Sequence, residues 1–282
     1  MLTVLEAIRL STDFLEKKGI SEARTNAELL LAEILNCKRL ELYLSFERPL
    51  SNDEKNKYRS FIARRGKFEP LQYITGTVEF MGLHFKVSRD VLIPRPETEI
   101  LVERIIEQSN NKNGLTILDV GTGSGNIAVS LSKHISNSKI LAIDKSEEAL
   151  KLARENAILN DTDQNIEFRL LDIFNLSINN KFDIIVSNPP YVDEEQYNTL
   201  QKEIVAFEPR MAVTDFDDGF NFYRKISELA KHHLNKNGKL FYEVGIGQSE
   251  KVKEIMEGNN FTGIKIEKDY SGIERVIFGE IL

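Results

Sequence analysis

The sequence predicts an α/β protein in which a doubly wound, mostly parallel sheet follows a small bundle of helices. Short apolar runs alternate with helical patterns from residue 115 onward, as they do in parallel sheets covered by helices on both faces. Residues 1–70 instead carry only helical periodicity. The tail over 263–281 has the pattern of a hairpin, so the sheet is expected to end in an antiparallel strand.

The changes of pattern predict three parts in a chain of 282 residues, which is longer than one typical domain. We expect a helical domain at residues 1–69, a β-hairpin linker at 70–94 and the sheet domain at 95–282. The linker prediction rests on near alternation of aromatic and β-branched residues around Gly76 and Gly82.

Helix signals recur throughout the predicted helical domain. Thr3 with Glu6, and Ser51 with Glu54, have the spacing of capping boxes that open helices. Between them, "TNAELLLAEILN" and "RLELYLSF" predict a second helix and a short third one. The helix that opens at Ser51 is expected to bury its apolar face, which holds Tyr58, Phe61 and Ile62.

The sheet is predicted from short apolar runs at 115–120, 138–144, 166–172, 182–187 and 238–244. The pattern "RPETEILVERIIEQ" before them predicts a helix with Pro96 in its first turn. Helical patterns also separate the runs, notably "NIAVSLSKHI" and "SEEALKLARENAIL". This order is that of strands joined by crossover helices.

Charge and hydropathy exclude several classes of protein. No run approaches the roughly 18–20 apolar residues of a membrane span, and the opening stretch "MLTVLEAIRL" lacks the features of a signal peptide. We therefore expect a cytoplasmic protein that does not bind membranes. The four histidines and the single cysteine show no metal-ligand spacing, so no metal is expected.

The net charge of −7 argues against a protein that coats nucleic acid. Charge is uneven, however, since residues 1–70 carry a small excess of basic side chains and the remainder is strongly acidic. The basic stretch at 55–67 is interpreted either as a solvated helix face or as a docking patch for an acidic partner.

A glycine loop marks the first candidate site. Gly121, Gly123 and Gly125 stand between the first predicted strand and a helix, where glycines let a ligand approach the backbone. Asp144 ends the second strand, at the position where a carboxylate accepts hydrogen bonds from a ribose. The alternatives are a tight turn without a ligand and, for Asp144, a role in capping the helix near Ser146.

The type of nucleotide follows from what the loop lacks. Asn126 stands where a dinucleotide fingerprint has its third glycine, and no Gly-Lys-Ser/Thr of a P-loop follows. With Asp119, Asp144 and Asp172 at successive strand ends, the pattern resembles methyltransferases that bind S-adenosylmethionine. That molecule carries a sulfonium and an ammonium, which carboxylates attract.

The second candidate site is "NPPY", Asn188, Pro189, Pro190 and Tyr191, directly after the fourth strand. This strand is expected beside the first, so its end lies near the glycine loop. Proline has no N–H, so the turn is stiff and its carbonyls are free acceptors. The Asn188 side-chain oxygen and the Pro189 carbonyl are predicted to hold a planar –NH2 group, with Tyr191 packed flat on it. The alternative is a turn that only ends the strand.

The motif is similar to that of amino-methyltransferases, whose acceptors include adenine or cytosine amino groups in nucleic acid and the glutamine amide in proteins. The motif alone does not distinguish these acceptors. The wider chain resembles the bacterial peptide chain release factor N5-glutamine methyltransferase family over roughly residues 70–282, and the helical bundle before it fits the family's N-terminal domain. The matching segments are "PLQYITGTVEFMGLHFKVSRDVLIPRPETE", "LDVGTGSGNIAVSL", "SNPPYV", "FEPRMAV", "DGFNFY" and "YEVGIGQ".

The resemblance implies methylation of the glutamine in the Gly-Gly-Gln loop of class 1 release factors. It also implies that the helical domain at 1–69 binds this substrate. We further expect a monomer, and the acidic balance of the rest of the chain argues against direct contact with nucleic acid. Arg95 and Glu97 are interpreted either as site residues or as structural ones. The residues implied to bind the methyl donor S-adenosylmethionine are Gly121, Thr122, Gly123, Ser124, Gly125, Asp144, Asp172, Ile173 and Asn188; those implied to hold the glutamine are Asn188, Pro189, Pro190 and Tyr191.

Overall fold

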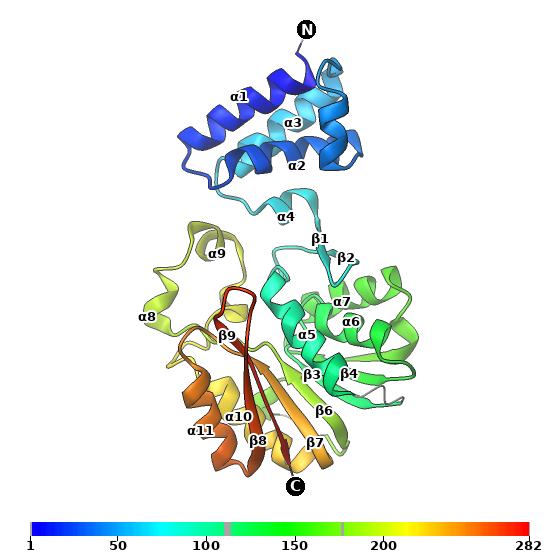
Figure 1. Ribbon diagram of the computed structural model, residues 1–282, viewed down its shortest axis with the longest axis vertical. Helices are drawn as coiled ribbons and strands as arrows, with labels where there is room; N and C mark the ends of the chain where they lie inside the picture. Colours follow the sequence, from blue (N-terminus) through cyan, green and yellow to red (C-terminus); the bar gives the residue numbers. More distant parts are fainter. Residues whose placement is uncertain (1, 110–113, 176–177, 282) are drawn as a thin grey trace. The chain divides into compact units, whose positions relative to one another are not determined.

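The computed structural model describes residues 2–109, 114–175 and 178–281, whose course is drawn in Figure 1. Contacts divide the chain into two compact units. The first is Met1–Gly76 with Gln201–Phe207, and the second is Thr77–Leu200 with Glu208–Leu282. The boundaries at residues 69 and 94 stay predictions, because this division gives two units and not three parts.

The first unit is helical. Both predicted capping boxes are present, since the Thr3 hydroxyl accepts from the Glu6 N–H and the Ser51 hydroxyl from the Glu54 N–H. The segment 201–207 joins this unit through an ion pair of 2.5 Å between Arg65 and Glu203. Its helices are α1 (Val4–Lys17), α2 (Ala23–Leu35), the 3₁₀ helix η1 (Arg39–Leu44), α3 (Asn52–Arg65), α4 (Leu71–Thr75) and α9 (Lys202–Phe207).

The predicted hairpin is shorter than expected, because its first residues form the helix α4. Pro70 is the N-cap of α4, and Gly76 ends it with a left-handed φ of +79°. A proline at the start and a glycine after the end are helix signals that the β-branched content of this segment obscured. The hairpin itself is β1 (Thr77–Phe80) paired antiparallel with β2 (Leu83–Lys86).

The second unit contains a seven-stranded sheet in the order β5-β4-β3-β6-β7-β9-β8. The β3–β4, β4–β5, β3–β6 and β6–β7 pairs are parallel, and β9 pairs antiparallel with both β7 and β8. The antiparallel end of the sheet and the neighbourhood of the first and fourth predicted strands are thus confirmed. The strands are β3 (Thr116–Val120), β4 (Lys139–Asp144), β5 (Ile166–Leu170), β6 (Phe182–Ser187), β7 (Leu234–Glu243), β8 (Phe261–Lys268) and β9 (Glu274–Ile281).

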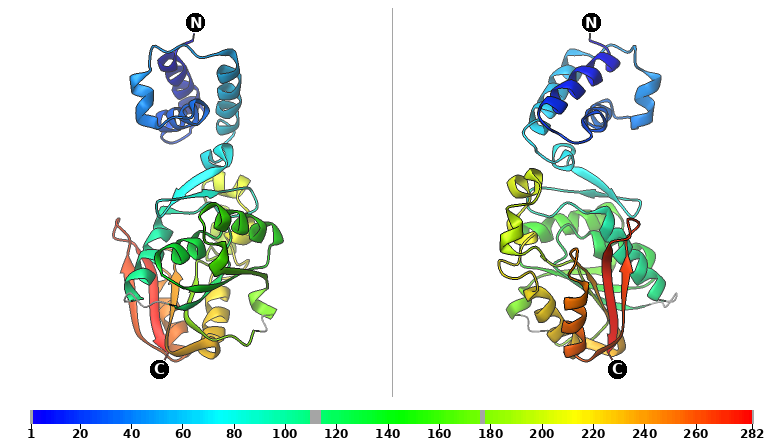
Figure 2. Two further views of the ribbon diagram at one scale, coloured as in Figure 1. Left: turned by 90° about the vertical axis from the view of Figure 1, so that its right-hand side faces the viewer. Right: turned by 60° about the vertical axis from the view of Figure 1, so that its left-hand side comes forward.

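Helices cover both faces of the sheet, as Figure 2 shows in two views. Neighbouring strand residues point to opposite faces, so Ile117 packs in a core with α5, α6 and the hairpin, whereas Leu118 packs in a second core with α10 and α11. The further helices are α5 (Pro96–Gln108), α6 (Asn126–His134), α7 (Glu147–Leu159), η2 (Asp163–Asn165), η3 (Ile173–Asn175), α8 (Glu194–Tyr197), η4 (Arg210–Ala212), α10 (Asn221–His233) and α11 (Ser249–Gly258). Among the described residues, none of the helices has the length and apolar character needed to traverse a bilayer.

Candidate active site

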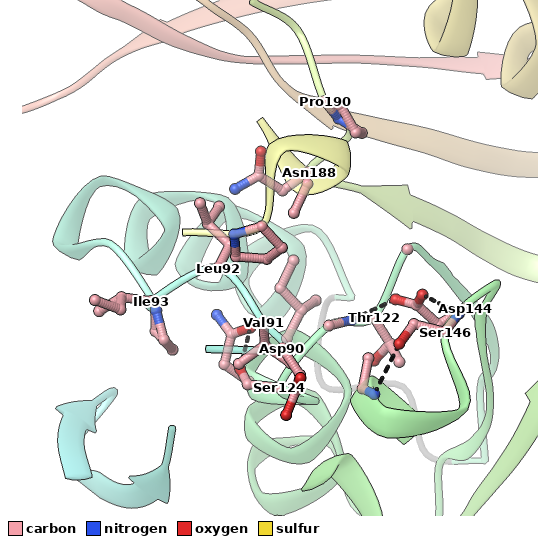
Figure 3. Close-up of a pocket in the computed structure, with 18 of the residues that line it drawn as sticks. Asp90, Val91, Leu92, Ile93, Thr122, Ser124, Asp144, Ser146, Asn188 and Pro190 are labelled. Carbon is pink, nitrogen blue, oxygen red and sulfur yellow. Dashed lines mark hydrogen bonds between the residues drawn. The ribbon is translucent and has the colours of Figure 1, made fainter. Parts of the chain in front are cut away.

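A cavity opens at the carboxyl ends of β3, β4 and β6. Its volume is about 850 Å³ when the open solvent at its mouth is included. It is lined by the loop after β3, by Asp144 at the end of β4 and by Asn188 after β6, together with the segment 90–95 that leads into α5 (Figure 3). The topology therefore gathers both candidate motifs in one place, where open α/β sheets bind their ligands.

The glycines of the loop after β3 serve different purposes. Gly121 and Gly123 line the cavity with left-handed φ of +74° and +54°, and a Cβ placed on either would meet no atom within 4 Å. Gly125 has a φ of +80° and faces α7, where a Cβ would lie 3.1 Å from the Cβ of Ala153. The first two glycines therefore leave room for a ligand, whereas Gly125 lets α6 and α7 approach each other.

This difference predicts unequal consequences for two matched substitutions. Gly125→Ala is expected to lower the free energy of unfolding by about 2–3 kcal/mol, because the strain of a left-handed residue adds to overpacking against Ala153. Gly121→Ala carries the same type of backbone strain without a clash and is expected to cost about 1 kcal/mol. Urea unfolding of both variants and the wild type checks this, and equal losses would contradict the packing role of Gly125.

A buried carboxyl group in β3 holds the glycine loop that follows this strand. Asp119, the penultimate residue of β3, is fully buried, and its Oδ2 accepts a hydrogen bond of 2.6 Å from the Thr122 hydroxyl. Burial raises the pKa of the Asp119 carboxyl to about 7, with a smaller contribution from the charge of Asp144. Asp119 is not among the described residues that line the cavity, so it acts on the loop and not directly on a ligand.

Asp144 holds the loop and the next helix at the same time. Its Oδ2 accepts from the Gly123 N–H at 2.9 Å and its Oδ1 accepts from the Ser146 N–H at 3.0 Å, as the dashed lines in Figure 3 show. The cap of α7 is the Ser146 hydroxyl, which accepts from the Ala149 N–H at 3.1 Å. Each carboxylate oxygen can accept a further bond, so Asp144 remains able to receive two hydroxyl groups from the cavity.

A smaller cavity adjoins the first, because Gly121, Asp144 and Pro190 line both. Asp172 and Ile173, which follow β5, lie in its wall, and the Asp172 Oδ1 accepts from the Phe174 N–H at 3.0 Å. Both predicted residues therefore lie where a ligand that extends past Asp144 would arrive.

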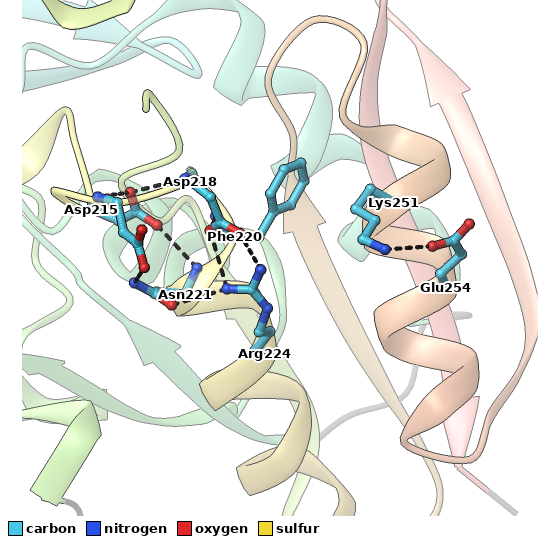
Figure 4. A network of polar contacts seen from close by, with 9 residues as sticks. Asp215, Asp218, Phe220, Asn221, Arg224, Lys251 and Glu254 are labelled. Atoms are coloured by element: carbon cyan, nitrogen blue, oxygen red, sulfur yellow. Dashed lines mark hydrogen bonds and ion pairs between the residues drawn. The ribbon is translucent and has the colours of Figure 1, made fainter. Parts of the chain in front are cut away.

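Phe222 lies in the walls of both cavities and was not predicted from the sequence as a site residue. It packs edge to face against Phe174, with ring centroids 5.2 Å apart. The loop before it is fixed by Asp215, whose carboxylate accepts from the backbone N–H groups of Asp217, Gly219 and Asn221. Figure 4 shows this loop together with the ion pair that joins Asp218 to Arg224 one turn into α10. The acidic segment thus positions an aromatic wall.

The residues after β6 reach the cavities in different ways. Asn188 lines the larger cavity, Pro189 the smaller one and Pro190 both. The Asn188 Nδ2 donates to the Thr98 hydroxyl at 3.1 Å. Tyr191 is not among the described residues that line either cavity: its partly buried ring packs against the core shared with α10, and its carbonyl accepts from Gln248 Nε2 at 2.8 Å.

The two ionic residues left open by the sequence differ in their positions. Arg95 lines the larger cavity and pairs with the buried Glu208 at 2.5 Å, while the Glu208 Oε2 accepts from the Ile93 N–H at 3.4 Å. Glu97 is not among the described residues lining that cavity. Arg95 and Glu208 therefore tie two segments of the cavity wall together.

The fold and this site define a methyltransferase. The family described as "Methyltransferase domain" matches residues 111–269. Two solved structures share the fold: a methyltransferase from Pyrococcus furiosus has a TM-score of 0.52 at 21% identity, covering 71% of this chain and 89% of that one. A ribosomal protein L11 methylase from Lactobacillus delbrueckii subsp. bulgaricus has a TM-score of 0.51 at 22% identity, covering 70% of this chain and 84% of that one.

The particular family follows from closer relatives. The release factor glutamine methyltransferase of Fusobacterium nucleatum is 40% identical, covering 98% of this chain and 78% of that protein. The enzyme of the same name from Geobacter sulfurreducens is 38% identical, covering 99% of this chain and 97% of that protein. The family described as "PrmC N-terminal domain" matches residues 6–76. This chain belongs to the release factor glutamine methyltransferase family, which confirms the family and the enzyme class predicted from the sequence.

Proposed function

We propose that this enzyme transfers a methyl group from S-adenosylmethionine to the side-chain amide nitrogen, N5, of the glutamine in the Gly-Gly-Gln motif of class 1 peptide chain release factors. The observation that carries the proposal is the single cavity in which the glycine loop, Asp144 and Asn188 meet. Membership of the family supports the substrate, because the relatives are named for glutamine methylation of release factors.

The described residues fit the donor. Gly121 and Gly123 leave space against the backbone for its methionine part, with Thr122, Ser124 and Gly125 shaping the loop, and carboxylates at the cavity favour a cation. Asp144 accepts the ribose hydroxyls with the lone pairs that its two backbone donors leave free. The smaller cavity takes the adenine, with Asp172 and Ile173 at its edge.

The acceptor amide is held by the residues after β6. When bound, S-adenosylmethionine supplies a methyl group on a positively charged sulfur, so that formation of the new N–C bond breaks the C–S bond and leaves a neutral thioether. The Asn188 Oδ1 and the Pro189 carbonyl accept the two N–H groups of the glutamine, which directs the nitrogen lone pair at the methyl group. The alkylated nitrogen then loses its proton to water. Pro190 fixes the turn. Tyr191 was predicted to pack on the amide plane, but it is not among the described residues that line either cavity; it supports the turn instead, because its carbonyl accepts from Gln248 Nε2.

Positioning supplies most of the catalysis in this scheme. Orienting two reactants in contact contributes roughly 7–11 kcal/mol when the reacting atoms lie about 3–3.5 Å apart. No general base is needed before attack, because only the alkylated nitrogen is acidic. This matches a site whose Asn188 and Pro189 are uncharged acceptors.

The release factor is held in part by the helical unit, whose basic stretch at 55–67 offers positive charge to an acidic partner. The acidic balance of the rest of the chain disfavours a nucleic-acid substrate. We further propose that the enzyme is a cytoplasmic monomer that acts on a protein and contacts neither nucleic acid nor membrane.

Mass spectrometry of purified release factor tests the proposal. After incubation with the enzyme and S-adenosylmethionine, we expect a gain of one methyl group on the glutamine of Gly-Gly-Gln, unchanged by prior nuclease treatment. A release factor in which that glutamine is replaced by alanine is the matched control and should stay unmodified. An unmodified factor, together with methylated adenine or cytosine in a parallel reaction with nucleic acid, would transfer the assignment to a nucleic-acid amino-methyltransferase.

A further inference from the structure

A chain of hydrogen bonds runs from the cavity into the protein interior. The Asn188 Nδ2 donates to the Thr98 Oγ1 at 3.1 Å, and the Thr98 Oγ1 donates to the Glu243 Oε2 at 2.6 Å. The three residues come from different elements: Asn188 follows β6, Thr98 lies in the first turn of α5 and Glu243 is the last residue of β7. The sheet and α5 together therefore place a carboxylate two hydrogen bonds away from Asn188. We call the Asn188 Oδ1 and the Pro189 carbonyl, which are proposed to hold the glutamine amide, the amide clamp.

The inner two residues of this hydrogen-bond chain are shielded from water. Thr98 is 1% exposed and Glu243 is 2% exposed. Thr98 and Asn188 line the larger cavity, whereas Glu243 is not among the described residues lining it. Glu243 consequently cannot touch a ligand there and acts on the site through Thr98 and the Asn188 amide.

The Glu243 carboxylate determines which group donates and which accepts in both hydrogen bonds. An ionised Glu243 can only accept, so the Thr98 hydroxyl must donate to it. The Thr98 oxygen then has only lone pairs to offer, and it selects the –NH2 end of the Asn188 amide. The Asn188 Oδ1 is therefore the end left for the cavity, and a flip of the amide that exchanged its oxygen and nitrogen would leave Thr98 and Oδ1 as two facing acceptors.

Glu243 is ionised at slightly alkaline pH. Burial raises the pKa of its carboxyl to about 7, and the charge of Glu97 adds to this, whereas the Thr98 donor, the Arg275 charge and the Asn188 amide favour the ionised form. At pH 8 the acceptor-only state is thus the main one. The hydroxyl of Tyr223 binds the Glu243 backbone carbonyl and leaves the carboxylate to Thr98.

We propose that Thr98 and Glu243 are positioning residues that set the amide orientation of Asn188, so that its oxygen and not its –NH2 group faces the acceptor. The inference rests on the proposed function, since only an acceptor with N–H groups requires the oxygen at that place. In the opposite orientation two –NH2 groups would meet, and the acceptor amide would lose one of its two hydrogen bonds.

A matched pair at Thr98 tests the hydroxyl. Thr98→Val keeps the shape and removes the donor, and we expect kcat for methylation of the release factor to fall about 10- to 100-fold at pH 8, with the Kd of S-adenosylmethionine within threefold of wild type. Thr98→Ser keeps the hydroxyl, so its kcat and its Kd for S-adenosylmethionine should both stay within about threefold of the wild-type values. Equal kcat values for the two variants would overturn the proposal.

Glu243 provides a second test at a residue that does not reach the cavity. Glu243→Leu removes the acceptor, so the Thr98 hydroxyl is free to donate to Asn188 and the amide orientation is no longer fixed. We expect the same loss of kcat as in Thr98→Val, and no additional loss in the double variant, because both act through one chain. Additive losses, with melting temperatures showing that all variants are folded, would contradict this chain.

A measurement without substrate separates this proposal from the proposed function. The side-chain –NH2 signals of Asn188, assigned by their absence in Asn188→Ala, can be followed by NMR. We expect slow hydrogen exchange in the wild type and Thr98→Ser, and fast exchange in Thr98→Val. Protected signals in an enzyme that does not methylate release factor would refute the proposed function alone, whereas unprotected signals in the wild type would refute the positioning chain alone.

Discussion

Asn188→Ala is expected to lower kcat for methylation of the release factor by about 10²- to 10³-fold while the Kd of S-adenosylmethionine changes by less than about threefold. The substitution removes one of the two acceptors proposed to orient the glutamine nitrogen, and the loss of a single preorganised polar group at a reacting centre has an effect of this size. The side chain lines the larger cavity after β6, and its –NH2 end is already bound to Thr98. In the variant, a substrate would therefore lose its hydrogen bond to the Asn188 oxygen.

The comparison needs donor binding by calorimetry and single-turnover kinetics at saturating release factor. Asn165→Ala is the matched control, because Asn165 is exposed and immediately precedes β5, at the amino end of the sheet. It should leave both quantities unchanged. If Asn188→Ala kept kcat within threefold of wild type, the amide clamp would have to be abandoned even though the cavity remains.

The alternation of strands and helices, and with it the place of the fourth predicted strand beside the first, could be predicted because it depends on patterns that lie close together in the chain. Short apolar runs alternate with helical segments, and parallel pairing of such units follows from general rules. The helix α4 was missed for the same local reason. "LQYIT" has strand-like composition, and only Pro70 before it and Gly76 after it signal a helix.

The part of the site that consists of residues within recognisable sequence motifs could be predicted. The positions of Gly121, Asp144 and Asn188 around one cavity follow from the strand order. The different purpose of Gly125 does not, because it depends on the close approach of Ala153 from another helix.

Contacts between distant segments explain the residues that sequence reasoning did not find. Thr98 and Glu243 are far apart in the chain and meet only when α5 packs against β7. Phe222 gave one signal, the acidic run at 215–218, whose carboxylates bind backbone N–H groups of the turn before α10. These bonds fix the start of α10, and Phe222 is the second residue of that helix.

Asp144→Ala is expected to weaken binding of S-adenosylmethionine by about 3 kcal/mol, or roughly 100-fold in Kd, with a smaller effect on kcat at saturating donor. Two hydrogen bonds from the ribose hydroxyls to a carboxylate account for this magnitude. The variant also loses the bond from the Gly123 N–H, which holds the loop in its open left-handed conformation. Isothermal titration of the donor measures the loss directly.

Two further variants separate these causes. Asp144→Asn keeps one acceptor oxygen, so it should hold either the Gly123 N–H or the Ser146 N–H and weaken donor binding to an intermediate degree. Glu147→Ala removes a charge from an exposed residue at the start of α7 and should leave the Kd unchanged. If Asp144→Ala and Glu147→Ala bound the donor equally well, Asp144 would only join the loop to α7, and the ribose would have to be bound by another residue of the cavity. Because Asp144→Ala also removes the bonds to the Gly123 and Ser146 N–H groups, its unfolding free energy is expected to fall as well. A loss of donor-binding free energy that exceeds this loss of unfolding free energy is the result that assigns the carboxylate to the donor.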